Sequence, residues 1–234
     1  MAASFVAAGS GLATTTTTLS LVAPAVINND VLFALIVSNN NTAVVAPGDW
    51  TLVSDTVNTA AMRTYLGYRR IGDSASGATF AFTVGGTTLS FGVIVAYRGC
   101  MLGGAVIGSV TSSANASSDN VTYATLLPGG PNRLLVAFGA YNLNATTAGA
   151  FSGTDPTFTQ RVDIETATGN TASLFVHDGP SLTNIATGSR TLVSASTVDA
   201  INHGYMLDLV DAQLPSGNGG PSTNLIRTRF YNYV

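Results

Sequence analysis

Charged residues are scarce in this chain of 234 residues, at 9% of the sequence against roughly a quarter in an average soluble domain. Lysine is absent and Glu165 is the only glutamate, so that 12 acidic and 9 basic residues leave a net charge of −3. Binding to DNA or RNA needs clustered basic residues, so we expect no nucleic-acid partner. Lys, Glu and Gln also fill the exposed faces of ordinary helices, and their scarcity disfavours a helical fold.

Three further features of ordinary secreted or membrane proteins are missing. The single cysteine, Cys100, cannot form an internal disulfide. The longest wholly apolar run covers only residues 31–37, whereas a membrane-spanning helix needs about 20 residues. No positive charge precedes the small residues at the N-terminus. We therefore expect no membrane span and no secretory signal.

The sequence is instead rich in turn residues and in short β-branched runs, with 25 glycines and 8 prolines. Short β-branched runs separated by glycine and proline predict an all-β fold, a β-sandwich in a single domain. The mean hydropathy of +0.34 leaves apolar surface that predicts a homo-oligomer. Ten strand-like runs are expected, at residues 30–38, 50–56, 63–70, 78–84, 90–99, 132–141, 158–166, 172–178, 189–195 and 204–211.

The ten runs form two sets of five that correspond in order. The matches are Trp50 with Phe158, Leu66 with Leu174, and Gly92 with Gly204. Because repeats change the fold assignment, we predict a jelly-roll-like β-sandwich built from two pseudo-repeated five-stranded halves that share one core. The sandwich would span residues 20–214, with the pseudo-repeats at 26–111 and 121–214.

Alternation of apolar and polar residues indicates which strand faces are buried. In residues 158–166 we expect Phe158, Val162 and Ile164 on one face. Residues 31–37 and 134–140 are apolar at every position. These two strands should lie centrally, covered on both sides by the sandwich, its loops or a neighbouring subunit.

The two ends of the chain fall outside the repeat. Residues 1–19 contain five consecutive threonines and predict an extended arm or an edge strand, with a frayed terminus as the alternative. Residues 215–223, rich in Gly, Pro and Ser, are expected to form a flexible linker. The segment 224–234 is aromatic and basic, which predicts a docking arm for a neighbouring subunit or a capsid lattice; the alternative is pairing with its own sheet edge. The interface residues expected there are Leu225, Ile226, Arg227, Arg229, Phe230, Tyr231 and Tyr233.

No catalytic, cofactor-binding or metal-binding residues emerge from the sequence, so we expect a protein that is not an enzyme. His177 and His203 do not stand at metal-ligand spacing from each other or from Cys100. His177 precedes Asp178, but neighbours on a strand point to opposite faces, and no Gly-x-Ser-x-Gly motif supplies a nucleophile. Asp163 and Glu165 are explained by a solvated strand face.

Cys100 and the aromatic residues have structural explanations as well. A reactive thiol needs a basic neighbour, for which Arg98 is a weak candidate, so we expect a structural Cys100. Exposed aromatic rings could stack on sugars, but positions beside other apolar residues favour core packing. The candidates for sugar stacking are Trp50, Tyr65, Tyr68, Tyr97, Tyr123 and Tyr141.

Three short motifs carry a resemblance to known modules. They are Pro-Gly-Asp-Trp at residues 47–50, Ala-Tyr-Arg-Gly at 96–99, and a second-half echo at 155–163 that lacks the glycine before Phe158. With these motifs, residues 26–211 resemble the duplicated β-sandwich modules of phage virion (decoration or tail) and bacterial surface proteins. The resemblance implies a decoration, tail or fibre role and gives no catalytic residues.

These observations predict a non-enzymatic structural protein of a phage virion, a capsid decoration or cement protein. Its partners would be its own copies and other virion proteins, foremost the major capsid protein. One alternative is a tail or tail-fibre component that binds carbohydrate on the host surface. Another is a carbohydrate-binding accessory module of a cell-surface hydrolase.

Overall fold

The computed structural model describes residues 2–72, 76–86, 88–130, 133–142, 147–151, 157–166, 172–181, 185–194 and 200–212. These residues form sixteen β-strands, β1 to β16, joined by turns and loops, which confirms the all-β class. Within this part of the chain, no helix is long and apolar enough to cross a membrane.

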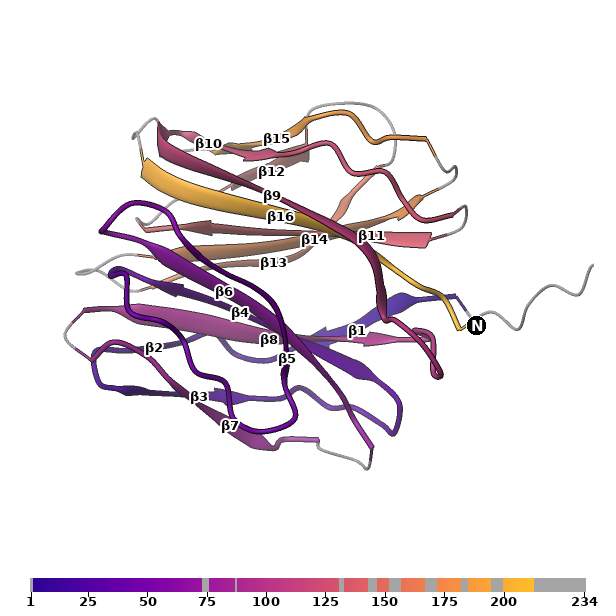
Figure 1. Cartoon of the computed structure of the whole chain (residues 1–234), viewed down its shortest axis with the longest axis horizontal. Coiled ribbons are helices and arrows are strands. Elements are labelled where there is room, and N and C mark those ends of the chain that lie inside the picture. Colours follow the sequence, from indigo (N-terminus) through magenta and orange to yellow (C-terminus); the bar gives the residue numbers. More distant parts are fainter. Residues whose placement is uncertain are drawn as a thin grey trace, which may run out of the picture.

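Two large antiparallel sheets form the centre of the molecule (Figure 1). The first has the strand order β1-β8-β4-β6-β5, and β2 also pairs with β8. Its strands are β1 (Ser4–Ala8), β2 (Leu12–Thr14), β4 (Val31–Ser38), β5 (Thr51–Val57), β6 (Arg63–Arg70) and β8 (Ser90–Arg98). The second has the order β13-β14-β11-β16-β9. Its strands are β9 (Ile107–Ser118), β11 (Arg133–Tyr141), β13 (Thr159–Glu165), β14 (Ser173–Ser181) and β16 (Ala200–Leu209).

Each large sheet is built from one half of the chain. The jelly-roll-like connectivity expected from the sequence is not confirmed, because each half of the chain supplies its own large sheet. The two halves of the chain nevertheless arrange their strands alike. If β4, β5, β6 and β8 are matched in chain order with β11, β13, β14 and β16, the order β8-β4-β6-β5 in one sheet becomes β16-β11-β14-β13 in the other. The edge strands β5 and β13 also carry a register shift at the same place, after Leu52 and after Gln160.

Strand register corrects one of the residue matches. Ser54 lies opposite Leu66, whereas Val162 lies opposite Val176. The structural counterpart of Leu66 is therefore Val176 and not Leu174, because the connection before β14 is longer than the connection before β6. The match of Gly92 with Gly204 agrees with the register, since these residues face Ile36 and Gly139 on the equivalent strands β4 and β11.

Two small sheets cover the outer faces of the large ones and make a four-layer stack (Figure 1). One is the pair of β3 (Thr18–Val22) and β7 (Thr79–Thr83); the other contains β10 (Asn120–Tyr123), β15 (Arg190–Ser194) and β12 (Thr147–Phe151). A central core lies between the two large sheets, and an outer core lies under each small sheet. Every residue of β4 is buried, so the expected two-sided burial of this strand is confirmed and is supplied by the chain itself.

The register shift in β13 overturns the expected face of Phe158. Val162 and Ile164 pack in the central core, whereas Phe158 packs against the outer core under β10 and β15. A β-bulge places an extra residue on one strand and so reverses the alternation of side chains beyond it. The bulge lies between Gln160 and Val162. Phe158 and Val162, four residues apart, therefore point to opposite faces.

The ends of the chain are only partly described. At the N-terminus, β1 and β2 pair in succession with β8 as edge strands of the first sheet. The described chain ends at Ala212, whose N–H donates to the carbonyl oxygen of Gly99 at 2.7 Å. The expected linker at 215–223 and the expected docking arm with Leu225, Ile226, Arg227, Arg229, Phe230, Tyr231 and Tyr233 lie outside the described residues.

Candidate functional site

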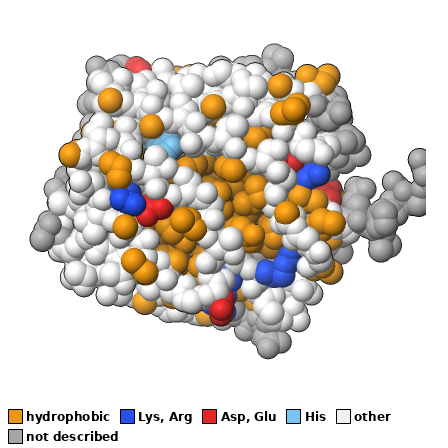
Figure 2. Space-filling model, in the orientation of Figure 1, with side chains coloured by type: hydrophobic (Ala, Val, Ile, Leu, Met, Phe, Trp, Pro, Cys, Tyr) orange, Lys and Arg blue, Asp and Glu red, His pale blue; other side chains and the backbone are white. Residues whose placement is uncertain are grey.

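The two long sides of the central sandwich differ in how they are covered. β1 lies against β13 and β8 against β14, which leaves the edge strands β5 and β9 together on the other side of the stack (Figure 1). The β1–β13 edge is closed by Phe5. This ring packs edge-on against Tyr97, with ring centroids 5.7 Å apart, and Cζ of Arg161 lies 5.1 Å from the centroid of the Phe5 ring. Figure 2 shows hydrophobic side chains gathered in the middle of the opposite face, between β5 and β9.

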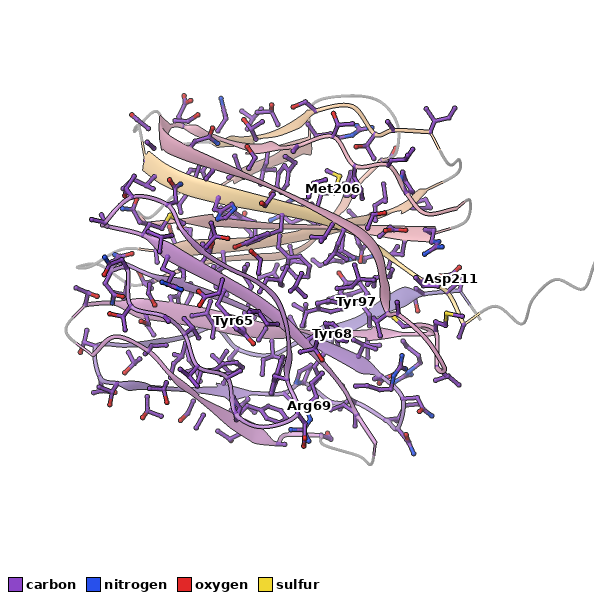
Figure 3. The ribbon with its side chains drawn as sticks, in the orientation of Figure 1. Tyr65, Tyr68, Arg69, Tyr97, Met206 and Asp211 are labelled. Carbon is purple, nitrogen blue, oxygen red and sulfur yellow. The ribbon has the colours of Figure 1, made fainter. Side chains whose placement is uncertain are left out.

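We call this region the β5–β9 opening and define it by Val53, Tyr68, Ile107 and Val110. Val53, Tyr68 and Ile107 are partly buried and pack on the central core, and Tyr68 lies 5.9 Å from the Phe33 ring, measured between centroids. Val110 is 44% exposed. Figure 3 shows Tyr68 in the space between β5 and β9. The opening therefore exposes the rim of the apolar core.

The inner face of β9 has no cover along the opening. Val110, Ser112 and Ala114 are exposed, although they stand opposite the buried residues Leu207, Tyr205 and His203 of β16. Side chains of directly paired residues lie on the same face of a sheet. Residues 110, 112 and 114 thus point toward the interior of the sandwich, where the first sheet does not reach them.

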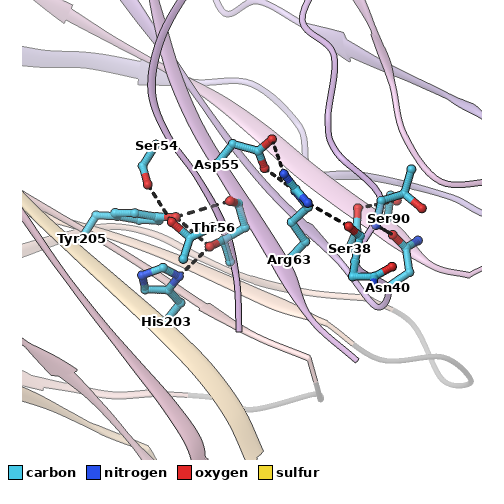
Figure 4. Close-up of polar contacts among 12 residues, drawn as sticks. Ser38, Asn40, Ser54, Asp55, Thr56, Arg63, Ser90, His203 and Tyr205 are labelled. Atoms are coloured by element: carbon cyan, nitrogen blue, oxygen red, sulfur yellow. Dashed lines mark hydrogen bonds and ion pairs between the residues drawn. The ribbon is translucent and has the colours of Figure 1, made fainter. Parts of the chain in front are cut away.

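A polar contact layer closes one end of the opening (Figure 4). The hydroxyl oxygens of Thr64 and Tyr205 are 2.7 Å apart, and the Thr64 hydroxyl is 2.6 Å from Nδ1 of His203. Burial raises the pKa of Tyr205, and the hydroxyls of Thr64, Ser54 and Thr56 oppose this rise by hydrogen bonding. Burial also lowers the pKa of His203 to about 4. These groups tie the first sheet to β16 and stay neutral near pH 7.

The amide of Asn58 completes this closure. Its Nδ2 donates to the carbonyl oxygens of Asn115 at 2.9 Å and of Asn202 at 2.7 Å. The turn between β5 and β6 is thereby fixed to β9 and β16 at one end, and the remaining length of β9 along the opening is left without such a tie to β5.

Five of the seven arginines of the described chain form internal ion pairs, whereas Arg70 donates to the carbonyl oxygens of Asn29 and Met101 and Arg190 lies over the ring of Phe158. The pairs and their shortest N–O distances are Arg63–Asp55 at 2.5 Å, Arg98–Asp30 at 2.7 Å, Arg161–Asp178 at 2.8 Å, Arg133–Asp208 at 3.3 Å and Arg69–Asp49 at 3.6 Å. Three of the carboxylates, those of Asp30, Asp178 and Asp208, are almost fully buried. These ion pairs therefore fix segments of the chain to one another, and one of them, Arg98–Asp30, lies at a pocket.

The structure separates the residues that a catalytic or metal site would need. His177 is buried, which lowers its pKa to about 4, while the neighbouring Asp178 is paired with Arg161. Burial raises the pKa of the Cys100 thiol to about 12, so it is not a nucleophile near neutral pH. Among the described residues, no group of three His, Cys, Asp or Glu side chains could hold a metal ion.

The aromatic candidates for sugar stacking are packed in the three cores. Tyr65, Tyr97, Tyr123 and Tyr141 are buried. Tyr68 is partly buried in the rim of the central core. Trp50 is partly buried in the outer core under β3 and β7, where it packs edge-on against Phe80 and Phe82 with centroids 5.4 and 5.2 Å apart. The expectation that these rings serve core packing is confirmed.

A pocket of about 330 Å³ lies where β8 and β16 end. Its lining residues are Ile27, Asn28, Asn29, Asp30, Arg98, Gly99, Cys100, Leu102 and Ala212. The two charged groups in this lining are paired with each other, because Nε and Nη2 of Arg98 each donate to the Asp30 carboxylate at 2.7 Å. The pocket brings together Cys100 and Arg98, but the raised pKa of the thiol argues against a reactive pair there.

Comparison of the chain with protein-family models, curated proteins and solved structures finds no match. The geometry of the described residues therefore carries the functional argument. Sequence reasoning did not find the β5–β9 opening, because residues 107–118 lack the strong apolar alternation of the other strands. The one available signal was the absence of charge and proline from this stretch.

Proposed function

We propose that the chain is a non-enzymatic structural protein of a phage virion, a decoration or cement protein of the capsid. One observation carries this proposal. Five of the seven arginines of the described chain form internal ion pairs, while a long uncharged edge strand beside an apolar opening is left uncovered. Exposed apolar surface of this kind is typical of a protein that functions by contact with other proteins.

The kind of particle comes from the sequence motifs. Their resemblance to the duplicated modules of phage virion proteins supports a place on the virion, with copies of this chain and the major capsid protein as partners. The matching strand order of the two large sheets supports an origin by internal duplication. The arm at residues 224–234 would make the contacts between subunits, with Leu225, Ile226, Arg227, Arg229, Phe230, Tyr231 and Tyr233 as its contact residues.

The alternative of a tail or tail-fibre component that binds host carbohydrate has less support. Aromatic stacking would need exposed rings. All six candidate rings pack in the cores, so none of them offers an exposed ring face on which a sugar could stack.

Analysis of purified particles tests the proposal. Particles would be purified through a density gradient, their proteins identified by mass spectrometry, and the chain located by antibody labelling in electron micrographs. We expect multiple copies on the capsid surface. We also expect attachment to resist moderate salt, because an apolar contact is not screened. Absence of the chain from the particles, or labelling of the tail together with glycan binding by the isolated protein, would contradict the proposal.

A further inference from the structure

We propose that the end of the β5–β6 hairpin is an acid-sensitive clasp, which holds the two large sheets together at neutral pH and releases them at this end when His203 becomes protonated. The clasp consists of four side chains, those of Asn58, Thr64, His203 and Tyr205. This inference concerns a conformational change within one chain and goes beyond the proposed function, since it does not depend on a place on a virion.

The clasp joins the two sheets by hydrogen bonds between uncharged groups (Figure 4). The Thr64 hydroxyl of β6 lies 2.6 Å from Nδ1 of His203 and 2.7 Å from the hydroxyl of Tyr205, both on β16. The Tyr205 hydroxyl also donates to the carbonyl oxygen of Thr64 at 3.3 Å. In the turn between β5 and β6, Nδ2 of Asn58 donates to the carbonyl oxygen of Asn202 at 2.7 Å. Loss of this small set of contacts would free the hairpin end from the second sheet.

A positive charge on His203 would be buried among neutral groups. The side chain is 1% exposed, and its ring centroid lies 4.3 Å from that of Tyr205. No described carboxylate forms an ion pair with it. The side chains on the facing sides of the neighbouring elements are all uncharged: Ala114 of β9, Ala140 of β11, Ser54 and Thr56 of β5, Asn58 of the turn and Thr64 of β6.

The charged groups of β5 and β6 in this region lie on the other face of the first sheet. Asp55 and Arg63 are paired with each other at 2.5 Å. Asp55 stands opposite Tyr65, whose ring packs in the outer core. Directly paired residues share a face, and successive residues alternate between faces. Asp55 and Arg63 therefore point away from β16, whereas Thr64 points toward it.

Acid should shift this contact toward an open form. Burial lowers the pKa of His203 from its ordinary value of 6.5 to about 4 in the closed clasp. In an opened clasp the imidazole is hydrated and regains its ordinary affinity for a proton. The open form therefore binds protons more readily, and its population rises as the pH falls below 6.5. From the two pKa values, the equilibrium constant for opening should rise roughly 50-fold between pH 7 and pH 4.5.

The backbone of the hairpin turn also favours opening. Thr59 has a φ of 66°, in the left-handed region that β-branched residues rarely adopt. Such a conformation persists only where surrounding contacts hold it, and the neighbouring Asn58 supplies contacts with the second sheet. β5 is the last strand of its sheet and has no fully buried residue. Release of the clasp would relieve the strain at Thr59 and free a weakly buried edge strand.

Hydrogen–deuterium exchange of the full chain, measured by mass spectrometry between pH 7 and pH 4.5, tests this inference. The segment observed is residues 51–64, and β4 at the centre of the same sheet is the internal reference. Rates are corrected for intrinsic exchange at each pH. The test variant is His203→Gln, and His203→Phe replaces it if that variant does not fold. His177→Gln is the matched control, because His177 is buried with a pKa of about 4 but stands opposite Ala137, which packs in the outer core of the second half.

We expect the protection of residues 51–64 to fall roughly 50-fold between pH 7 and pH 4.5 in the wild type and in His177→Gln. β4 should keep its protection over this range, since the rest of the fold stays closed. In His203→Gln the protection of residues 51–64 should change less than about fivefold, because no imidazole remains to take up a proton at the clasp.

Three results would overturn the inference. The first is protection of residues 51–64 in the wild type that does not depend on pH. The second is an equal loss of protection in β4, since acid would then unfold the whole molecule and not open one end. The third is a fall in His203→Gln or His203→Phe as large as in the wild type.

Discussion

Gly92 and Gly204 let the small outer sheets approach the large ones closely, and replacing either with alanine should destabilise the protein. A Cβ atom at Gly204 would lie 2.8 Å from the carbonyl oxygen of Thr122 and 2.9 Å from Cδ1 of Tyr123, both in β10. A Cβ atom at Gly92 would lie 2.9 Å from Cδ2 of Leu19 and 3.0 Å from Cδ1 of Leu21, both in β3. The two equivalent glycines thus allow β3 and β10, strands of the two outer layers, to pack closely on the large sheets.

The expected free-energy changes follow from which atoms must move. Overpacking a core costs about 1 to 3 kcal/mol, while Gly→Ala without strain stabilises by about 0.4 to 1 kcal/mol through the unfolded state. At Gly204 the obstacle is a backbone oxygen that cannot turn aside, so we expect Gly204→Ala to lower the free energy of unfolding by about 2 kcal/mol. At Gly92 the obstacles are the ends of leucine side chains, so we expect a loss of about 1 kcal/mol.

Urea unfolding followed by circular dichroism measures both changes, and thermal melting provides a second reading. For a chain of this size, a loss of 2 kcal/mol should lower the melting temperature by roughly 4 to 8 °C. Gly72→Ala is the control, because a Cβ atom there meets nothing within 4 Å. If Gly204→Ala proved as stable as the wild type, or if Gly72→Ala cost more than Gly204→Ala, the close approach of β10 to β16 would be wrong.

Three other perturbations test the packing, the ion pairs and the buried histidines. Trp50→Ala should cost about 3 kcal/mol in urea unfolding, the lower end for a large aromatic, because its ring is only partly buried; a cost near zero would show that the ring does not pack on β7. Arg98→Ala leaves the buried Asp30 carboxylate without its cation and should destabilise the fold more than Asp49→Asn, which breaks an exposed pair worth less than about 1 kcal/mol; equal losses of unfolding free energy in the two variants would refute the difference in burial. The pKa of His203 is lowered to about 4, so its neutral form stabilises the fold above pH 6.5, and this contribution is lost as the pH falls toward 4. When the pH is lowered from 6.5 to 4, the free energy of unfolding of His203→Gln should therefore decrease by up to about 3 kcal/mol less than that of the wild type. Identical pH profiles of the two proteins would contradict the lowered pKa of His203.

The sequence predicted the strands of the central layers well, because their apolar runs are long and bounded by turn residues. β4 and β6 lie within one residue of the expected ranges, and the burial of β4 on both faces followed from its unbroken apolar run. β3, β9, β10 and β12 were missed as strands, and for β1 and β2 the sequence left an arm, an edge strand and a frayed terminus open. β9 and β10 consist mainly of small and polar residues with little apolar alternation, and tertiary pairing with neighbouring strands decides their conformation.

The site and the details of register could not be read from the sequence for a different reason. The bulge before Val162 reverses the facing of Phe158, and no residue type in β13 marks a bulge. The β5–β9 opening depends on how far two edge strands stand apart, which is set by packing in the core between the sheets and by the polar layer at Tyr205. A sequence pattern records which face is apolar, but it does not show which of two equivalent edges stays uncovered.

A high-resolution cryo-EM map of the intact phage particle tests the central claim most directly. The account predicts repeated copies of this four-layer fold on the outer surface of the capsid, each in contact with the major capsid protein and with a neighbouring copy. A particle whose map has no density for this fold on the capsid would contradict the account.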